Sequence, residues 1–299
     1  MNWRWPWRRR KKEPKPPWIV RLLRRRGIRL SRRAEWLLGW AETIVEVGLA
    51  VWLIITYVTV RMTVPTGSMI PTIMPGDSFF VDRISYHFRQ PDVGDVIVFW
   101  HVEDIRITGV KAESPAAAAG VKPGDQLIEL AGEPVPSTVT LRRRLEAASG
   151  GKISLTLLRE GSGEVKVEVA VPTGARSLSD LGLQVKIRKA RYVKRLIAVG
   201  GQQVWIGEGG RIYVDGAPLD VPAIASRTYW THGPGMRYGI EPTLIPEGHY
   251  FVLGDNTMNS YDSRYWGFVP EEDFIGEPFF RVWPFSRFGP MNGYFWSSR

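Results

Sequence analysis

The sequence contains no cysteine and only four histidines. The lack of cysteine excludes disulfide bridges, thiolate catalysis and cysteine-based zinc sites, although it does not fix the compartment. The histidines lie in loop or strand contexts without an obvious acidic partner, at positions His87, His101, His232 and His249. An imidazole base is therefore poorly supported, and we expect neither a metal nor a cofactor.

Acidic residues are nearly absent from the first 33 residues, which hold 14 of the 40 Lys and Arg but only Glu13. The remaining chain carries 26 basic and 29 acidic residues, so the net charge of +10 belongs to the tail. A protein that binds nucleic acid through its folded part needs a basic surface there. We therefore expect a basic tail at residues 1–35 and no nucleic-acid partner.

One apolar run, residues 43–60, has about the length that a bilayer crossing requires. Glu42 and Glu46 weaken this prediction because a carboxylate is costly at depth, and a buried helix of a soluble protein is the alternative. Basic residues precede the run and only Arg61 closely follows it, which favours a cytoplasmic N-terminus. No convincing cleavage site follows, so we expect a retained transmembrane anchor at 36–60.

A segment rich in proline and glycine, MTVPTGSMIPTIMPGDSFFVDRISY, follows the apolar run. Ser68 lies there between Gly67 and Met69, in a tight turn that can aim the Ser68 N–H at a reacting carbonyl. The final residues, FFVDRISY, alternate like a strand. A serine in such a loop is most often only a turn residue, so a catalytic role requires a partner base.

A lysine among apolar residues supplies a candidate base. In RYVKRLIAVGG, alternation places Tyr192, Lys194 and Leu196 on one face of a strand. Burial disfavours the ammonium form, and lowering its pKa from about 10.4 to about 8 corresponds to roughly 3 kcal/mol. Taken alone, Lys194 also fits a solvated strand lysine.

Short polar side chains are concentrated in a third segment, FVLGDNTMNSYDSRYWGFVP, at residues 251–270. They lie in a turn between two apolar stretches. Such a loop suits hydroxyl and ion-pair support of a catalytic lysine. It also fits a hydrogen-bonded surface connection.

Four segments, PTGSMIPT, GDVIVF, RYVKRLIAVGG and GDNTMNSYDSRYWGFV, resemble in this order the sequence boxes of bacterial type I signal peptidases. The resemblance covers about residues 36–100 and 190–288. It implies a mainly β, antiparallel catalytic body at 61–102 and 189–299, anchored in the bacterial inner (cell) membrane with its catalytic domain on the outer or periplasmic side. It also implies a serine endopeptidase that removes N-terminal signal peptides after small residues of Ala-X-Ala type. Thr257 and Met258 depart from the family, whose members commonly have Arg and Asp there.

The resemblance also implies a role for each matched position. Ser68 corresponds to the nucleophile, Lys194 to the general base, and Thr66 to a hydroxyl that completes an oxyanion hole with the Ser68 N–H. The residues matching the supporting positions, a serine that hydrogen-bonds the lysine and a structural ion pair, are Ser260, Asp262 and Arg264. The residues matching the walls of small pockets for Ala-like side chains are Met62, Val64, Met69, Ile73, Tyr192 and Val193.

Most of a hundred residues separate Phe99 from Tyr192, where compact relatives have a short loop. We expect an inserted small α+β domain at 103–188. Ser114 can cap a short helix. The segments QLIEL, KISLTLLRE and EVKVEVAV are predicted strands, the last two forming a hairpin, and TVTLRRRLEAA is a predicted helix. ESPAAAAGVKPGDQLI resembles the signature of PDZ domains of bacterial proteases, which bind peptide C-termini.

The segment Leu181-Gly182-Leu183 is a candidate carboxylate-binding loop, displaced by permutation to the end of the insertion. The alternative is a strand that simply returns to the catalytic body. The partners expected from these resemblances are preprotein signal peptides, the lipid bilayer and a peptide C-terminus at the insertion.

Two other classes of function compete with a Ser/Lys peptidase. The first is a PDZ-bearing scaffold on an inactive peptidase body, against which the intact Ser68, Lys194 and Ser260 argue. The second is a Ser/His protease of the PDZ-containing trypsin-like class. That class requires a His…Asp…Ser order and a GNSGG-like box, which the sequence lacks.

Overall fold

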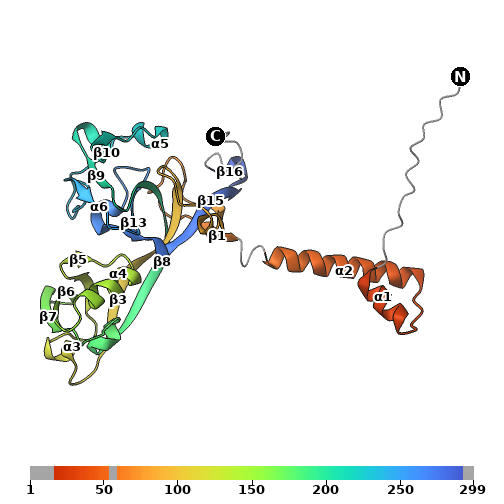
Figure 1. The fold of residues 1–299 in the computed structure, drawn as a ribbon, viewed down its shortest axis with the longest axis horizontal. Helices are drawn as coiled ribbons and strands as arrows, with labels where there is room; N and C mark the ends of the chain where they lie inside the picture. Colours follow the sequence, from red (N-terminus) through yellow and green to blue (C-terminus); the bar gives the residue numbers. More distant parts are fainter. Residues whose placement is uncertain (1–16, 54–58, 292–299) are drawn as a thin grey trace. The chain divides into compact units, whose positions relative to one another are not determined.

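The computed structural model describes residues 17–53 and 59–291, in two units that divide between Val58 and Thr59. The first unit is a helical hairpin in which α1 (Trp18–Arg25) folds back on α2 (Arg32–Leu53) (Figure 1). The Glu42 carboxylate accepts hydrogen bonds from the backbone N–H groups at the start of α1, at 3.0 Å from Trp18. Glu42, a residue that weakens the membrane prediction, therefore caps a neighbouring helix.

The helix α2 is long and apolar enough to cross a membrane, and none of its described residues is buried. It begins at Arg32, four residues before the predicted anchor. The last two residues of the predicted anchor, Thr59 and Val60, lie instead in strand β1, where they pair with Asp82 and Val81. Their β-branched side chains suit a half-buried strand, and pairing with β2 decides the assignment.

The second unit is built on an antiparallel β-sheet, as the sequence predicts. In its catalytic body, β1 pairs with β2, β2 with β15, β15 with β3, β3 with β8, and β8 with β13. The strands of the body are β1 (Thr59–Thr63), β2 (Ser78–Asp82), β3 (Val96–Val110), β8 (Leu183–Val199), β13 (His249–Leu253), β14 (Val269–Pro270), β15 (Phe274–Trp283) and β16 (Gly289–Pro290). A smaller sheet contains β9 (Gln203–Ile206), β10 (Ile212–Val214), β11 (Ala217–Pro218) and β12 (Thr243–Leu244).

The strand β2 ends at Asp82, earlier than the alternation in FFVDRISY predicts. The Asp82 carboxylate accepts hydrogen bonds from the N–H groups of Ile84 and Ser85, at 2.8 and 3.1 Å. These bonds fold the chain into a turn and the short helix η2 (Ser85–His87).

The strands β3 and β8 join the body to the insertion. They pair from Val96–Arg195 in the body to Val110–Leu183 in the insertion, and Figure 1 shows them running side by side between the two parts. Because one continuous ladder crosses this junction, the segment expected to be an insertion extends the same sheet as the body.

Local signals in the insertion are confirmed. Ser114 accepts a hydrogen bond from the Ala117 N–H at 3.2 Å, and Gly120 has a positive φ just after the helix. The elements are α3 (Pro115–Ala118), β4 (Gln126–Leu130), β5 (Glu133–Pro134), α4 (Thr138–Ala147), β6 (Lys152–Arg159), β7 (Gly163–Ala170) and η3 (Leu178–Leu181). A hydrophobic cluster drawn from residues between Val102 and Leu183 forms their own core.

The candidate loop Leu181-Gly182-Leu183 joins η3 to β8. Gly182 has φ +86°, and a Cβ there would overlap the side chain of Ser114. A glycine is required at this position by both the backbone conformation and the close packing. The two interpretations of the loop, carboxylate binding and a returning strand, both accommodate this geometry.

Candidate active site

The side chains of Ser68 and Lys194 meet in the catalytic body. Lys194 Nζ donates a hydrogen bond to Ser68 Oγ at 2.8 Å, although 126 positions separate them in the sequence. Ser68 comes from the loop between β1 and β2, and Lys194 from the middle of β8. The lysine side chain is buried, with 3% of the residue exposed.

The environment of Lys194 favours an uncharged amine. Burial, with a smaller contribution from Arg264, lowers the pKa of Lys194 from 10.5 to about 8, against the opposing effects of the Asp262 and Asp255 carboxylates. Desolvation disfavours the ammonium form because the apolar surroundings solvate it poorly. A substantial fraction of neutral amine close to neutral pH is what a lysine needs in order to accept a serine proton.

The C-terminal loop holds the turn that carries Ser68. The N–H and the side-chain amide of Asn256 donate to the carbonyl oxygens of Ser68 and Gly67, both at 3.0 Å. A Cβ at Gly254 would overlap the Ser68 carbonyl oxygen and the Ser260 hydroxyl, so glycine allows this close approach. The two loops therefore pack as one body, and this packing sets the position of Ser68.

The expected ion pair is present and buried. Arg264 donates through Nε and Nη2 to the two carboxylate oxygens of Asp262, both at 2.8 Å. Arg264 also donates to the carbonyl oxygens of Trp230 and Thr257, at 2.7 and 3.0 Å, while Asp262 accepts from the Gly254 N–H at 3.0 Å. The pair thus ties together the loop that holds Ser68.

The hydroxyl of Ser260 lies close to this arrangement but does not make the expected hydrogen bond to Lys194. Its Oγ is buried and has no partner in the described part of the chain. The side chain instead packs where Gly254 lacks a Cβ. A supporting role for Ser260 stays a prediction.

A cleft of about 320 Å³ opens beside the two side chains. Its lining includes Thr66, Met62, Val64, Tyr192 and Val193, all expected from the sequence. The remaining two expected pocket residues, Met69 and Ile73, are fully buried in the core cluster that also contains Met62, Val64 and Val193. They therefore support the cleft wall from behind.

Two buried groups near the dyad had no role in the sequence analysis. His101 is 4% exposed, and its ring centroid lies 4.4 Å from that of Tyr192 and 4.8 Å from that of Trp266. Burial, together with Lys194, lowers the pKa of His101 to about 3. This histidine is therefore an uncharged packing group, for which the sequence carries no local signal.

The second group is an ion pair between β8 and the loop that follows β13. Arg195, the residue after Lys194, pairs with Asp255 through Nε at 2.7 Å and Nη2 at 2.5 Å, and both residues are buried. Arg227 also approaches Asp255, at 3.3 Å. In the sequence, its only signal is a charged residue directly before the apolar run LIAV at 196–199. Within residues 17–53 and 59–291, no cluster of three or more His, Asp or Glu is arranged for metal binding.

Several known proteins are similar to this chain. A family model described as signal peptidase, peptidase S26, matches residues 37–283. A probable signal peptidase I-1 of Synechocystis sp. is 27% identical over 231 residues, covering 77% of this chain and 74% of that protein. Among solved structures, a signal peptidase I from Enterococcus faecalis is 34% identical, with a TM-score of 0.23, over 29% of this chain and 81% of its own.

A second solved structure, the PDZ domain of an SdrC-like protein from Listeria monocytogenes, is 16% identical, with a TM-score of 0.23, over 27% of this chain and 85% of its own. Both TM-scores are too low to support a structural argument. The family match is independent of them and spans most of the chain, from the apolar helix to β15. The chain belongs to the signal peptidase family, peptidase S26.

Proposed function

We propose that this protein is a membrane-anchored signal peptidase that removes N-terminal signal peptides from exported proteins, with Ser68 as nucleophile and Lys194 as general base. The observation that carries the proposal is the 2.8 Å contact between a buried amine and the serine hydroxyl. A lowered lysine pKa, to about 8, supports the same roles.

The proposed reaction uses the amine twice. Neutral Lys194 accepts the Ser68 proton as Oγ attacks the scissile carbonyl, and the resulting ammonium gives a proton to the leaving amine. The acyl-enzyme ester is then hydrolysed by a water that Lys194 deprotonates, and the Lys194 ammonium returns this proton to Ser68 Oγ as the ester bond breaks. We assign stabilisation of the oxyanion to the Ser68 N–H and the Thr66 hydroxyl, since Thr66 lines the same cleft.

The proposed specificity for small residues follows from the shape of the cleft. Its apolar walls include Met62, Val64 and Val193, which are backed by a packed core and cannot retreat easily. Such walls accept a methyl group and exclude longer side chains.

A detergent-solubilised cleavage assay tests the proposed function. We expect the full chain to cut a preprotein with an Ala-X-Ala site, and a matched preprotein with leucine before the scissile bond to be cut about 5- to 150-fold more slowly, because overpacking costs about 1–3 kcal/mol. Mass spectrometry of the released fragments gives the cleavage site. Equal rates for the two preproteins would reject the specificity, and no cleavage of either would reject the function.

The pH dependence of cleavage tests the proposed base separately. The pKa of Lys194 is about 8, so the reactive neutral amine increases as the pH rises through that value. We expect kcat/KM to rise about tenfold for each pH unit below pH 8 and to level off above it. A profile that falls over this range, or one controlled by a group near pH 6.5, would contradict a lysine base.

The bilayer is a further part of the proposal. Contact with lipid is supported by the exposed apolar helix α2 and by three exposed aromatic residues of the body, Trp283, Phe285 and Phe288. The basic residues before α2 support a cytoplasmic N-terminus, with the catalytic body on the outer side of the bacterial inner membrane.

We also propose that the insertion, with expected bounds 103–188, binds a peptide C-terminus. In the described chain, β8 pairs with β3 along one edge, and its second edge has no strand partner from Leu183 to Lys194. An unpaired edge can accept an extended peptide as an added strand. The loop ending at Gly182 lies at the start of this edge, where a carboxylate would be held.

A further inference from the structure

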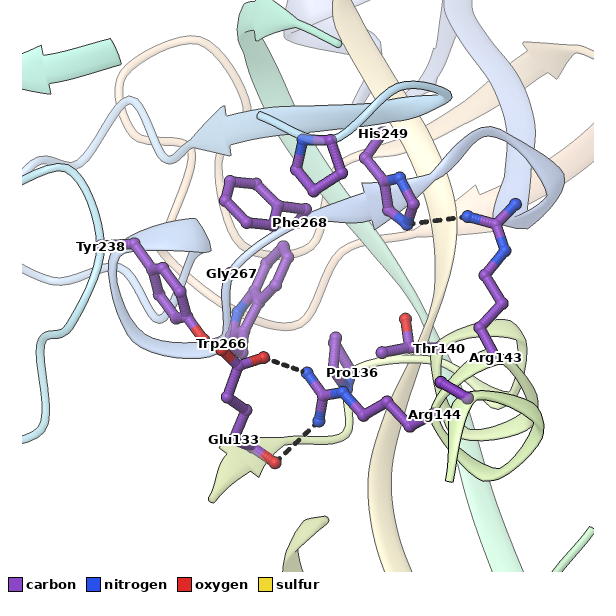
Figure 2. A pocket seen from close by; sticks show the side chains of 12 residues that line it. Glu133, Pro136, Thr140, Arg143, Arg144, Tyr238, His249, Trp266, Gly267 and Phe268 are labelled. Atoms are coloured by element: carbon purple, nitrogen blue, oxygen red, sulfur yellow. Dashed lines mark hydrogen bonds and ion pairs between the residues drawn. The ribbon is translucent and has the colours of Figure 1, made fainter. Parts of the chain in front are cut away.

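A second cavity lies between the insertion and the catalytic body, away from the dyad. This junction pocket, of about 320 Å³, is lined by Thr140, Arg143 and Arg144 from α4 and by Tyr238, His249 and Trp266 from the body, among others. Figure 2 shows the two arginines extending from α4 into the pocket, on the side opposite the ring side chains of the body. Neither Ser68 nor Lys194 lines it.

The Arg143 guanidinium of the pocket uses only part of its hydrogen-bonding capacity. Arg143 donates to Glu272 at 2.8 Å and approaches His249 Nε2 at 3.1 Å. A dashed line in Figure 2 marks the contact with His249. The Arg143 and Glu272 side chains are 41% and 47% exposed, so their pair is weak and exchangeable. Arg144 differs because it is held by the Glu133 carboxylate and by three backbone carbonyls. Arg143 is therefore the group that a ligand carboxylate can recruit.

Two further polar groups of the lining have no hydrogen-bond partner in the described part of the chain. They are Trp266 Nε1, on a residue that is 2% exposed, and Thr140 Oγ1. Both atoms have almost no accessible surface. An unsatisfied buried polar group costs about 1–3 kcal/mol, so an acceptor that reaches these donors after a small shift of the pocket wall is favoured. One lies on the body and the other on the insertion, which suits a ligand that contacts both walls.

The rest of the lining is mostly apolar, with Pro136 and Ala147 on the insertion side and Pro246 and Phe268 on the body side. A cavity of this size and character suits a compact apolar group with one polar end. We propose that the junction pocket binds a small carboxylate with an aromatic or branched apolar body, and that its occupancy is coupled to the catalytic cleft.

The coupling follows from what the pocket wall contacts. Trp266 packs on His101, His101 stacks on Tyr192, and the Tyr192 ring centroid lies 5.4 Å from Lys194 Nζ. Trp266 also ends α6 (Ser263–Trp266), which begins directly after Asp262. A ligand that touches α4 and Trp266 together stabilises the docked insertion and thereby the wall of the substrate cleft.

Binding is tested on the full chain carrying Ser68→Ala, by calorimetric titration with N-acetylphenylalanine and with its uncharged amide. We expect the acid to bind and the amide to bind at least about tenfold more weakly, a difference of about 1.4 kcal/mol. Arg143→Gln should weaken the acid about tenfold, whereas Arg142→Gln, the same change at an exposed residue of α4 outside the pocket lining, should leave it unchanged. Ala147→Trp should abolish binding by filling the cavity.

Three results would overturn the site: equal binding of acid and amide, equal loss in the Arg142 and Arg143 variants, or binding that survives Ala147→Trp.

The coupling rests on the proposed function and has its own test, the KM and kcat of the protein with native Ser68 on a peptide substrate. We expect saturating N-acetylphenylalanine to change KM at least about twofold, with no effect in Ala147→Trp. An equal effect in both proteins would place the acid in the catalytic cleft and reject the coupling, while the calorimetric result still decides the site.

Discussion

Replacing Lys194 with methionine is expected to abolish cleavage while making the folded chain more stable. Loss of a general base costs about 10²–10⁴ in rate, and a serine with no other base nearby should lie at the upper end of that range. The gain in stability has a separate origin. The folded state lowers the pKa of Lys194 from 10.5 to about 8, which corresponds to about 3 kcal/mol of destabilisation when the amine is charged in both states.

The pH dependence of that destabilisation has a definite sign. Between pH 8 and 10.5 the unfolded chain binds more protons than the folded chain, so stability rises with pH over this window. The full cost of burying the charge is present below pH 8. Methionine removes the cost at neutral pH but also removes the hydrogen bond to Ser68, worth about 1 kcal/mol, which leaves a net gain of about 2 kcal/mol.

Thermal unfolding at pH 7 measures this gain as a rise of about 4–8 °C in Tm. Lys186→Met is the matched control, because Lys186 lies on the same strand and face but is exposed. It should change neither activity nor Tm. Cleavage by Lys194→Met within tenfold of the unmodified protein would reject the proposed mechanism.

Replacing Arg264 with methionine is expected to cost about 3–5 kcal/mol of unfolding free energy, because it leaves a buried carboxylate without its partner. Asp262 is fully buried and Arg264 is 1% exposed. The same change frees three backbone carbonyls, those of Trp230, Thr257 and Ser260, and loosens the loop that holds Ser68. Activity should therefore fall together with stability.

Denaturant unfolding gives the change in free energy. Arg176→Met is the matched control, since its pair with Glu146 is exposed at 76% and 42% and should contribute less than about 1 kcal/mol. The double variant Asp262→Asn with Arg264→Met should recover part of the loss, because it no longer buries an unpaired charge. A loss below 1 kcal/mol in Arg264→Met would show that the pair does not hold the loop.

Much of the fold was predictable because its signals are local. Alternation in RYVKRLIAVGG placed Lys194 in a strand, Ser114 and Gly120 bounded the first helix of the insertion, and the basic tail preceded the apolar helix. Each depends on residues a few positions apart, where backbone geometry and propensity act directly.

Other features escaped prediction because the partners are distant in the sequence. His101 lies among rings from β8 and α6, Arg195 of β8 pairs with Asp255 in the loop after β13, and Thr59 joins β2 in place of the apolar helix. The two unpartnered donors of the junction pocket, Thr140 and Trp266, are 126 positions apart. No local pattern encodes such neighbours.

By itself the sequence determined which side chains are available for the chemistry, in which order, and on which kinds of element they stand. Only the tertiary structure decided that the Lys194 amine reaches the Ser68 hydroxyl, that the Ser260 hydroxyl has no hydrogen-bond partner among the described residues, and that a pocket opens at the base of the insertion. Composition and spacing act along the chain, whereas the distance, burial and pKa of a group depend on what packs around it in space.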